Sequence, residues 1–392
     1  PPPPPPPPPP RPPPPPHMPG VSNSRVVQYY ASWAIYGRQF FPWDMHFDKI
    51  THVHYAFFDV NAACEVVSLD PWADYDIVFP EMGMAWGDGR MHGNLGAFEE
   101  LKRRHPHLHV AVSLGGWTKS QYFSGCAAHA AGRAKVAATA VALVQSAGFD
   151  GVDVDWEFPV CCGETYNEYA ADDWDKFLLL LHEMRNALDA AFPTVHKELT
   201  IAVGMNAQLT EATPMAELAG VLDAVNLMTY DYNGAWGCDA PEGCLAAHCA
   251  PLYGDADAPA HARHKRYIDW GVQQWLAAVP ASKLVLGLPA YGRTFSGTAS
   301  EYGVGNGAAP GTNPTEPGLV AYFDLAAHYI GSAGWTHHWN AQSKVPFLTN
   351  PHGGLGFITY DDEASVAIKA AYARQQGLLG LMWWEASDDK DG

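Results

Sequence analysis

The sequence predicts an α/β fold, a closed (β/α)8 TIM barrel that carries a small inserted α+β module. Eight short segments rich in apolar and β-branched residues alternate with segments of helical periodicity, as parallel strands and their connecting helices do. Polar and aromatic residues follow most of the strand-like segments, where a barrel carries its functional groups. The chain has 392 residues, 47% of them hydrophobic, which is enough for one large core.

The strand-like segments are short and follow one another in a regular rhythm. We expect strands at residues 25–32, 49–58, 108–115, 150–159, 199–205, 224–229, 284–289 and 378–384. The strongest helical pattern begins with acidic residues and carries a leucine-rich apolar stripe, both typical of an amphipathic helix. We expect helices at residues 133–146, 172–192, 263–278 and 363–376.

One interval breaks this rhythm, because about sixty residues, 295–356, lie between the seventh strand and the last helix without the pattern of a strand and its helix. A structureless loop of that length is improbable in a compact domain. We therefore predict an inserted α+β module at residues 295–356, standing on the rim of the barrel. The barrel itself is then expected at residues 21–294 and 357–392, and residues 357–360 have the composition of a short closing strand.

The first residues and the overall charge restrict the setting of the protein. Residues 1–16 are proline apart from Arg11, and such a tract adopts an extended polyproline conformation. We expect a disordered linker at residues 1–20, and a longer protein to which it belongs. A net charge of −19 argues against nucleic acid and anionic membranes as partners, and no apolar run is long enough to predict a membrane span.

The cysteines and histidines offer two weak metal-site alternatives. The seven cysteines leave at least one unpaired, and three of them lie close together in one loop, where a disulfide is expected in an oxidising compartment. Zinc binding by Cys238, Cys244, His248 and Cys249 is disfavoured, because their spacing does not match common zinc motifs. The His-x-His pair at residues 52–54 lacks a third histidine at another strand end, so we expect no metal and no cofactor.

The fourth strand-like segment, residues 150–159, concentrates acidic residues on one face. Asp153, Asp155 and Glu157 alternate with apolar residues, so they point the same way at intervals of about 6–7 Å. Crowded carboxyl groups cannot all ionise, and the crowding raises at least one pKa, as a proton donor working near neutral pH requires. A solvated edge strand is the alternative, but the apolar opposite face argues against it.

Together with Asp150, these acids complete the pattern Asp-x-x-Asp-x-Asp-x-Glu, in which the chain resembles the family 18 glycoside hydrolases, the chitinase family. The likeness continues at other strand ends, with Ser-Leu-Gly-Gly at residues 113–116 and Met-Thr-Tyr-Asp at residues 228–231. It extends from residue 25 to residue 391. One departure is His-Cys-Ala-Pro-Leu-Tyr at residues 248–253, where the family often has Asn-x-Pro-Leu-Tyr.

The resemblance implies a retaining, substrate-assisted mechanism, in which the N-acetyl oxygen of the sugar attacks the anomeric carbon. Glu157 would protonate the glycosidic oxygen and later activate water as a base. Asp155 would hold the acetamido N–H, and Asp153 would share a proton with Asp155. Tyr230 would donate a hydrogen bond to the acetyl oxygen.

The resemblance also implies a cleft lined from several strand ends. Trp384 would form the floor under the reacting sugar. The substrate-binding residues predicted in this way are Tyr29, Phe57, Trp117, Met228, Asp231, Tyr291, Arg293 and Trp384.

The function expected from this resemblance is that of a secreted, extracellular chitinase. It would hydrolyse the β-1,4 bonds of chitin and chitooligosaccharides as a monomer. A chitin-binding lectin is one alternative, although the presence of Glu157 favours an enzyme. An endo-N-acetylglucosaminidase acting on N-glycans is another, and a metal-dependent hydrolase is a third.

Overall fold

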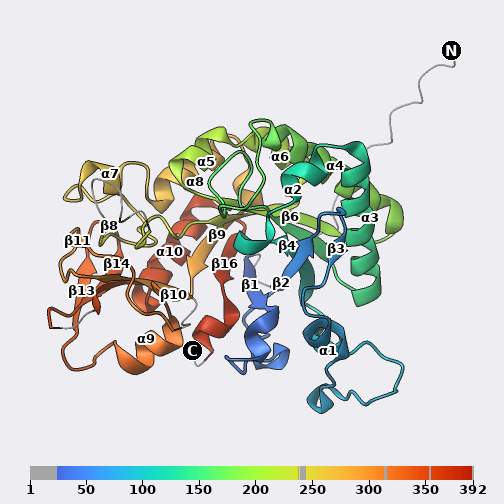
Figure 1. Cartoon of the computed structure of the whole chain (residues 1–392), viewed down its shortest axis with the longest axis horizontal. Coiled ribbons are helices and arrows are strands. Elements are labelled where there is room, and N and C mark those ends of the chain that lie inside the picture. The colour runs from blue at the N-terminus through green and yellow to red at the C-terminus, as the bar shows by residue number, and fades with distance from the viewer. Residues whose placement is uncertain (1–23, 237, 239–243, 313–315, 353–354, 391–392) are drawn as a thin grey trace.

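The computed structural model describes residues 24–236, 238, 244–312, 316–352 and 355–390, so the linker predicted at residues 1–20 lies outside the described residues. Within these ranges a closed barrel of eight parallel strands, surrounded by helices, forms the body of the molecule (Figure 1). The strands of the barrel are β1 (Arg25–Ala31), β2 (His52–Val60), β4 (His109–Gly115), β5 (Gly151–Asp155), β6 (Glu198–Gly204), β7 (Ala224–Met228), β9 (Leu284–Pro289) and β16 (Gly380–Trp384).

The barrel closes because β1 pairs in parallel with both β2 and β16. Around the barrel the order is β1-β2-β4-β5-β6-β7-β9-β16, and β3 (Val66–Val67) adds an antiparallel partner to β2. The predicted fold class is therefore confirmed. The strand predicted at residues 150–159 is shorter than expected. β5 ends at Asp155, which pairs with Gly115, the last residue of the neighbouring strand β4.

Most of the helices pack around the outside of the barrel, whereas α9 lies with a second sheet beside it. Their bounds are α1 (Gly93–Arg104), α2 (Phe123–Ala127), α3 (Ala130–Ala147), α4 (Asp173–Ala191), α5 (Ala207–Ala212), α6 (Met215–Val221), α7 (Ala260–Arg263), α8 (Ile268–Leu276), α9 (Tyr322–His328) and α10 (Glu363–Gln376). The prediction of a continuous helix at residues 263–278 is wrong. Lys265 has a φ of 56°, in the left-handed region, and this interrupts helical geometry between α7 and α8. No helix in the described ranges is both long and apolar enough to cross a membrane.

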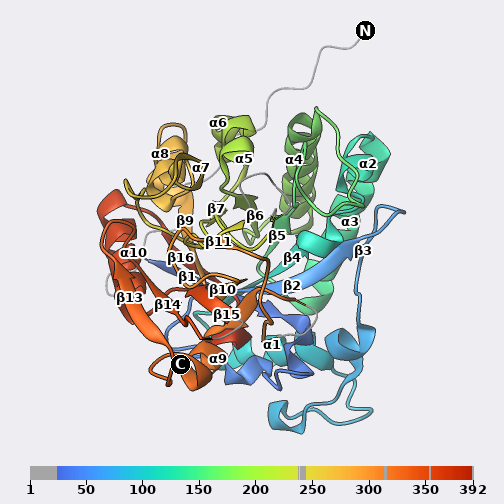
Figure 2. The ribbon, with the colours of Figure 1, turned by 60° about the vertical axis from the view of Figure 1, so that its left-hand side comes forward.

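A separate antiparallel sheet stands beside the barrel, and Figures 1 and 2 both show its strands grouped with α9 on one side. It has the order β12-β10-β15-β14-β13, and its presence fits the predicted α+β module, whose boundaries at residues 295 and 356 stay a prediction. Its strands are β10 (Tyr291–Ser296), β12 (Leu319–Ala321), β13 (Thr336–Asn340), β14 (Val345–Thr349) and β15 (Leu355–Thr359), and a small ladder joins β8 (Cys244–Leu245) to β11 (Val304–Gly305).

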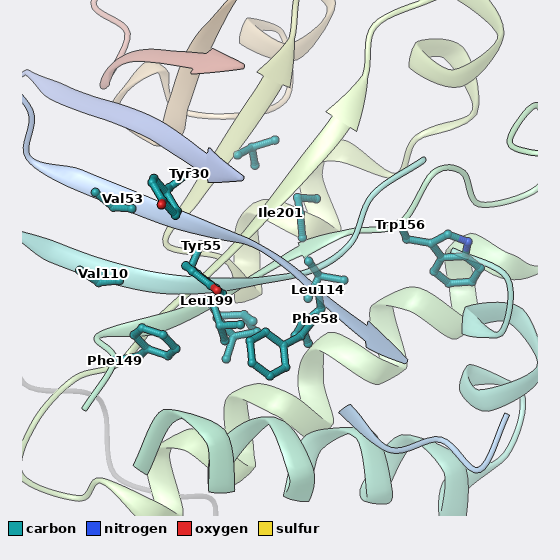
Figure 3. Packing of buried hydrophobic residues seen from close by; sticks show 14 of the residues in the cluster. Tyr30, Val53, Tyr55, Phe58, Val110, Leu114, Phe149, Trp156, Leu199 and Ile201 are labelled. Atoms are coloured by element: carbon teal, nitrogen blue, oxygen red, sulfur yellow. The ribbon is translucent and has the colours of Figure 1, made fainter. Parts of the chain in front are cut away.

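The main hydrophobic core fills the space between the barrel strands and the helices. Figure 3 shows Tyr55, Phe58, Leu114 and Phe149 in this layer, where the side chains are almost completely buried. Val152 and Val154 of β5 belong to the same cluster, so the intervening acidic residues of this strand face the barrel interior. The alternation read from the sequence thus directs the carboxyl groups inward.

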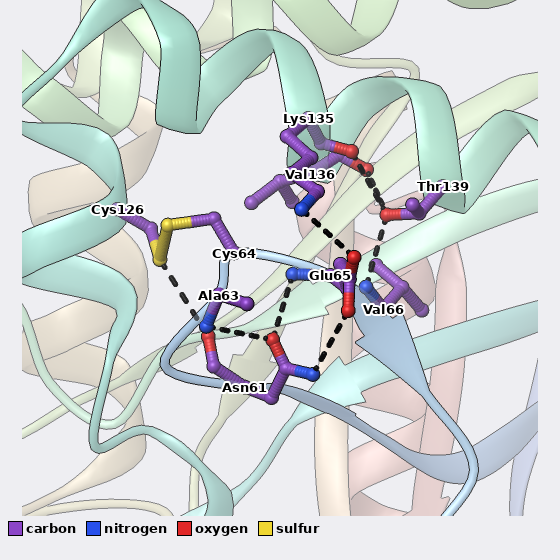
Figure 4. The surroundings of a disulfide bond; sticks show 9 residues. All are labelled: Asn61, Ala63, Cys64, Glu65, Val66, Cys126, Lys135, Val136 and Thr139. Carbon is purple, nitrogen blue, oxygen red and sulfur yellow. Dashed lines mark hydrogen bonds and ion pairs between the residues drawn. A yellow bond between two sulfur atoms is a disulfide. The ribbon is translucent and has the colours of Figure 1, made fainter.

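Disulfides fix three loops. Cys64, which lies just before β3, is joined to Cys126 in α2 (Figure 4). Two backbone hydrogen bonds hold the same segment, because the N–H of Glu65 donates to Asn61 Oδ1 and the N–H of Val66 donates to Thr139 Oγ1. The other pairs are Cys161–Cys162 and Cys238–Cys244, and the second of these is a disulfide within the predicted three-cysteine loop. Among the described residues, Cys249 remains a free, buried thiol.

Candidate active site

Asp153 lies at the centre of a hydrogen-bond network inside the barrel. Its Oδ2 accepts from the hydroxyls of Tyr29 (2.9 Å) and Ser113 (2.8 Å). Its Oδ1 accepts from Thr200 Oγ1 (2.6 Å) and Asn226 Nδ2 (3.2 Å). Four strands besides β5 thus supply donors to one fully buried carboxylate, and this satisfies all the acceptor capacity that burial would otherwise leave unpaired.

His54 from β2 completes the surroundings of Asp153, with its Nδ1 3.5 Å from Asp153 Oδ2. Burial pushes the pKa of Asp153 upward, but the positive charge that His54 can carry and the hydrogen bonds from Thr200 and Ser113 outweigh it, so the pKa is lowered. Asp153 is therefore ionised. No group of His, Cys, Asp and Glu side chains in the described part of the chain has an arrangement that could hold a metal ion.

Asp155 has the opposite environment, although it lies two residues further along the same strand. It is 3% exposed, and its Oδ1 has no hydrogen-bond partner among the described residues. Burial, followed by the charges of Glu157 and Asp153, raises the pKa of Asp155 well above its usual range. A buried acceptor without a partner is costly, so this oxygen is suited to receive a donor from a bound molecule.

Glu157 stands just beyond the end of β5 and is half-buried. Its backbone is fixed on both sides, because its N–H donates to Ser120 Oγ (2.8 Å) and its carbonyl accepts from Asn167 Nδ2 (2.9 Å). Burial and the charge of Asp231 raise the pKa of Glu157 to about 8. The side chain therefore carries a proton at neutral pH and can act as a general acid.

Asp150, the first acid of the pattern, lies at the other end of the strand. It precedes β5, accepts the N–H of Val110 (2.8 Å) and pairs with Lys102 (2.7 Å). Its place at the N-terminal face of the barrel gives it a role in stability rather than in chemistry.

The segment after β7 and the start of β10 form the wall that faces Glu157. Arg293 holds Asp231 through two hydrogen bonds of 2.8 and 2.5 Å, and its guanidinium lies 5.0 Å from the ring centres of Tyr291 and Trp236. Asp231 is thereby fixed in one orientation.

Tyr230 lies beside this wall, with its ring centre 6.3 Å from that of Tyr291. Burial, and then the charges of Asp155 and Glu157, raise the pKa of Tyr230 well above its usual range. Its hydroxyl therefore keeps its proton and can donate a hydrogen bond.

Aromatic side chains form the floor of the site. Trp384 stacks on Phe57 with ring centres 5.4 Å apart, and Tyr29 lies 5.7 Å from Trp384. Met228 packs in the same cluster, while Trp117 lies at the end of β4 with 45% of its surface exposed. The strand ends thus bring the predicted substrate-binding residues to one face of the barrel.

Sequence reasoning missed several members of the site. Thr200, Asn226 and His54 supply polar contacts to Asp153, and a sign of them was available, since each is a polar residue within an apolar strand. Trp33 was missed as well. The centre of its ring lies 6.3 Å from that of Phe57, and the residue is 50% exposed. Its position shortly after the end of β1 could have indicated it.

Comparison with known proteins assigns this arrangement to a family. The model of "Glycosyl hydrolases family 18" matches residues 25–389, which include every side chain of the site. The chain belongs to family 18 of the glycosyl hydrolases. The family resemblance expected from the acidic pattern is confirmed.

Two curated relatives in family 18 illustrate the likeness. Chitinase A1 of Niallia circulans is 37% identical over 94% of this chain, and Chitinase 1 of Aphanocladium album is 33% identical over 93%. The chain spans 57% of the length of the first relative and 81% of the second.

Solved structures agree in fold. Chitinase ChiA74 from Bacillus thuringiensis has a TM-score of 0.85 at 32% identity, covering 94% of this chain and 66% of its own. A family 18 N-acetylglucosaminidase from Paenibacillus barengoltzii has a TM-score of 0.76 at 31% identity, covering 94% of this chain and 96% of its own.

One segment in which this family 18 member differs from the usual family pattern contacts the site. Cys249, within the segment that differs from the usual family pattern, places its Sγ 3.4 Å from Asp231 Oδ1. Its backbone N–H donates to Thr359 Oγ1 (3.1 Å), which fixes the segment to β15. The thiol thus adds a weak third contact to the carboxylate that Arg293 holds.

Proposed function

We propose that the chain is a chitinase that hydrolyses the β-1,4 bonds between N-acetylglucosamine units with retention of configuration. The observation that supports this most is that Glu157, whose raised pKa favours the protonated acid, follows on the same strand segment as buried Asp155, whose Oδ1 has no hydrogen-bond partner among the described residues. Such a pair can give a proton to a glycosidic oxygen while it receives the N–H of an acetamido group. The names of the curated relatives agree with this substrate.

The surroundings of the other carboxyl groups favour substrate assistance over a protein nucleophile. A protein nucleophile must be ionised and must lie on the face of the sugar opposite the acid. Asp155 comes from the same strand segment as Glu157 and has a raised pKa, while Asp231 is held by Arg293. The acetamido oxygen of the substrate then takes the part of the nucleophile.

The reaction proceeds in two steps. Glu157 gives its proton to the glycosidic oxygen, while the acetamido oxygen bonds to the anomeric carbon and the leaving sugar departs. The Glu157 carboxylate then takes a proton from water, whose oxygen bonds to the anomeric carbon as the bond to the acetamido oxygen breaks. Two inversions give net retention.

Asp155 and Asp153 together stabilise the positively charged intermediate. Asp155 accepts the acetamido N–H and stabilises the positive charge that forms on the oxazolinium ring. Asp153 sets the charge state of Asp155: its four donors hold it ionised in the free site, so the one proton of the pair lies on Asp155, and this proton must move to Asp153 for Asp155 to become anionic in the reaction. Tyr230 donates to the acetyl group and orients it for attack.

The proposed setting is that of a secreted monomer. Three disulfides are formed within the described residues, as expected for an oxidising compartment. All the proposed catalytic side chains come from a single chain, so no second copy is required to complete the site.

A comparison of matched substrates tests this function. We expect soluble products from colloidal chitin and from N-acetylglucosamine hexasaccharide, but rates at least about 10³-fold lower with cellohexaose, which has no amide to attack. Equal cleavage of both hexasaccharides would contradict substrate assistance. Binding without cleavage would indicate a lectin, and preferential release from a glycoprotein would indicate an endo-N-acetylglucosaminidase.

The pH dependence should report the state of Glu157. Because the acid must be protonated at the start, kcat/KM should fall as pH rises through about 8, the raised pKa of this group. Initial rates with a fluorogenic chitobioside, measured between pH 5 and about 10, will show this decrease in kcat/KM and its midpoint. Tryptophan fluorescence over the same range separates titration from unfolding. A decrease in kcat/KM centred near the ordinary pKa of a glutamate would contradict the role of Glu157 as an acid with a raised pKa.

A further inference from the structure

The loop between β5 and α4 contains a disulfide between two adjacent residues, Cys161 and Cys162. Such a bond closes a small ring that includes only the peptide unit between the two cysteines. A disulfide restricts the unfolded chain more strongly the longer the segment that it encloses, so this one contributes little to the free energy of unfolding. Cys64 and Cys126, by contrast, are 62 residues apart. Global stability therefore does not account for the adjacent pair.

This disulfide is accessible from the solvent. Cys162 is exposed and Cys161 is half-buried. Each of the other two disulfides formed among the described residues has one buried cysteine, since Cys126 is 3% and Cys244 is 2% exposed. Thiol–disulfide exchange begins when a thiolate attacks one sulfur of the bond, so its rate depends on access to that sulfur. A dissolved thiol should therefore react with the adjacent pair first.

The ring is connected to the backbone of the proposed acid. Cys162 has a φ of 73°, in the left-handed region that residues other than glycine rarely adopt, and the closed ring restricts it to that conformation. Gly163 follows, and it lies so close to the Glu157 carbonyl that a Cβ on Gly163 would be 2.2 Å from this oxygen. Asn167 Nδ2 donates to the same oxygen (2.9 Å). The conformation of Cys162 thus determines how the loop contacts Glu157.

A second contact connects the loop to an aromatic side chain of the site. Glu164, two residues after Cys162, accepts a hydrogen bond from Trp117 Nε1 (2.7 Å). The centre of the Trp117 ring lies 6.2 Å from that of Phe158, the residue after Glu157. A change of conformation at Cys162 is therefore expected to alter the surroundings of Trp117 as well as those of the acid.

We propose that Cys161–Cys162 is a site of reversible redox modification, at which a dithiol opens the ring and loosens the loop from Glu157 and Trp117. Where it concerns hydrolysis, this inference rests on the proposed function, since Glu157 is the proposed acid. The oxidised form is the more active one. The reduced form keeps the fold, because the bond encloses so short a segment, but holds the backbone of the acid less firmly.

The exchange transfers two electrons from the dithiol to the protein. A thiolate of the dithiol attacks the exposed Cys162 sulfur, the S–S bond breaks, and Cys161 leaves as a thiolate that takes a proton. The second thiol of the reductant then attacks the mixed disulfide, so Cys162 leaves and is protonated while the reductant closes into its own disulfide. A disulfide such as oxidised glutathione reverses the exchange.

The experiment treats the folded protein with dithiothreitol, alkylates the thiols that form, and locates them by mass spectrometry of peptides. We expect Cys161 and Cys162 to be labelled at least about 10-fold faster than Cys64 and Cys126, because they are more accessible. Over the same period kcat/KM for a fluorogenic chitobioside should fall about 3- to 10-fold, the effect of a small displacement of the acid. Removal of dithiothreitol and addition of oxidised glutathione should restore it.

Two paired variants separate this site from the other disulfides. The variant with Cys161→Ser and Cys162→Ser should have the lower activity of the reduced protein, a melting temperature near that of the wild type, and no response to dithiothreitol. The variant with Cys64→Ser and Cys126→Ser keeps the adjacent pair and should keep the response. Equal labelling rates for the two disulfides of the wild type would overturn the proposal. An unchanged kcat/KM after Cys161 and Cys162 have been reduced would overturn it as well.

Labelling and fluorescence need no hydrolysis, so they distinguish this proposal from the proposed function. Reduction should change the tryptophan fluorescence of the wild type. The chain has 14 tryptophans, and loss of the change in Trp117→Phe would identify its source. If the protein cuts no substrate, selective labelling together with this fluorescence change would still support the redox site. Unchanged fluorescence in that case would overturn it.

Discussion

Glu157→Gln is expected to lower kcat for the N-acetylglucosamine hexasaccharide by about 10³-fold, within the range that general acid catalysis contributes. An amide of the same shape cannot give a proton to the glycosidic oxygen or take one from water. The backbone contacts of this residue involve Ser120 and Asn167 and do not depend on its side chain, so the fold should be preserved. Initial rates and product chromatography will measure the loss.

The binding measurement separates chemistry from affinity. The Kd of the hexasaccharide for Glu157→Gln should stay within about threefold of the wild-type value, since the aromatic floor around Trp384 is unchanged. A variant that turns over at near wild-type rates would refute the role of Glu157. A melting temperature far below that of the wild type would show that the loss came from the fold instead.

Asp155→Asn is expected to lower kcat by about 10²-fold, with a smaller change in KM. The asparagine oxygen can still accept an acetamido N–H, but it brings no negative charge to the oxazolinium ring, and one lost electrostatic contact in a buried site has an effect of this size. Rates at saturating and limiting concentrations of the hexasaccharide separate kcat from KM.

Asp150→Asn is the matched control, because it makes the same chemical change at the opposite end of the strand. Asp150 pairs with Lys102, away from the proposed reaction, so its replacement should reduce the melting temperature and leave kcat unchanged. Equal effects of the two substitutions on kcat would mean that the charge of Asp155 has no special part in catalysis.

The fold and the acidic centre were accessible from the sequence for a simple physical reason. A strand repeats every two residues, so the pattern of β5 alone separates its buried valines from its inward carboxyl groups. The closing helix α10 was also predicted correctly at residues 363–376. Its first turn has a local signature, since Asp362 and Ser365 cap one another through hydrogen bonds of 2.9 Å.

Contacts between distant segments were less accessible. The environment of Asp153 depends on donors from strands far away in the sequence. Thr200 and Asn226 stand out as polar residues within apolar strands, but no local pattern shows that both reach the same carboxylate. The break before α8 escaped prediction because Lys265, a residue with good helical propensity, adopts a left-handed conformation there. In the same way, the hydrogen bond from the Tyr166 hydroxyl to the Thr118 carbonyl joins segments 48 residues apart and has no local signature.

The pairing of β1 with β16 couples the start of the described chain to its end. Trp384, the proposed floor, lies on the strand that completes this closure, whereas the acids of β5 come from the middle of the chain. During synthesis on the ribosome, the acidic residues therefore emerge long before the surface on which a sugar could rest. The growing polypeptide would gain the proposed hydrolytic capacity in one step, when β16 docks against β1, rather than by degrees.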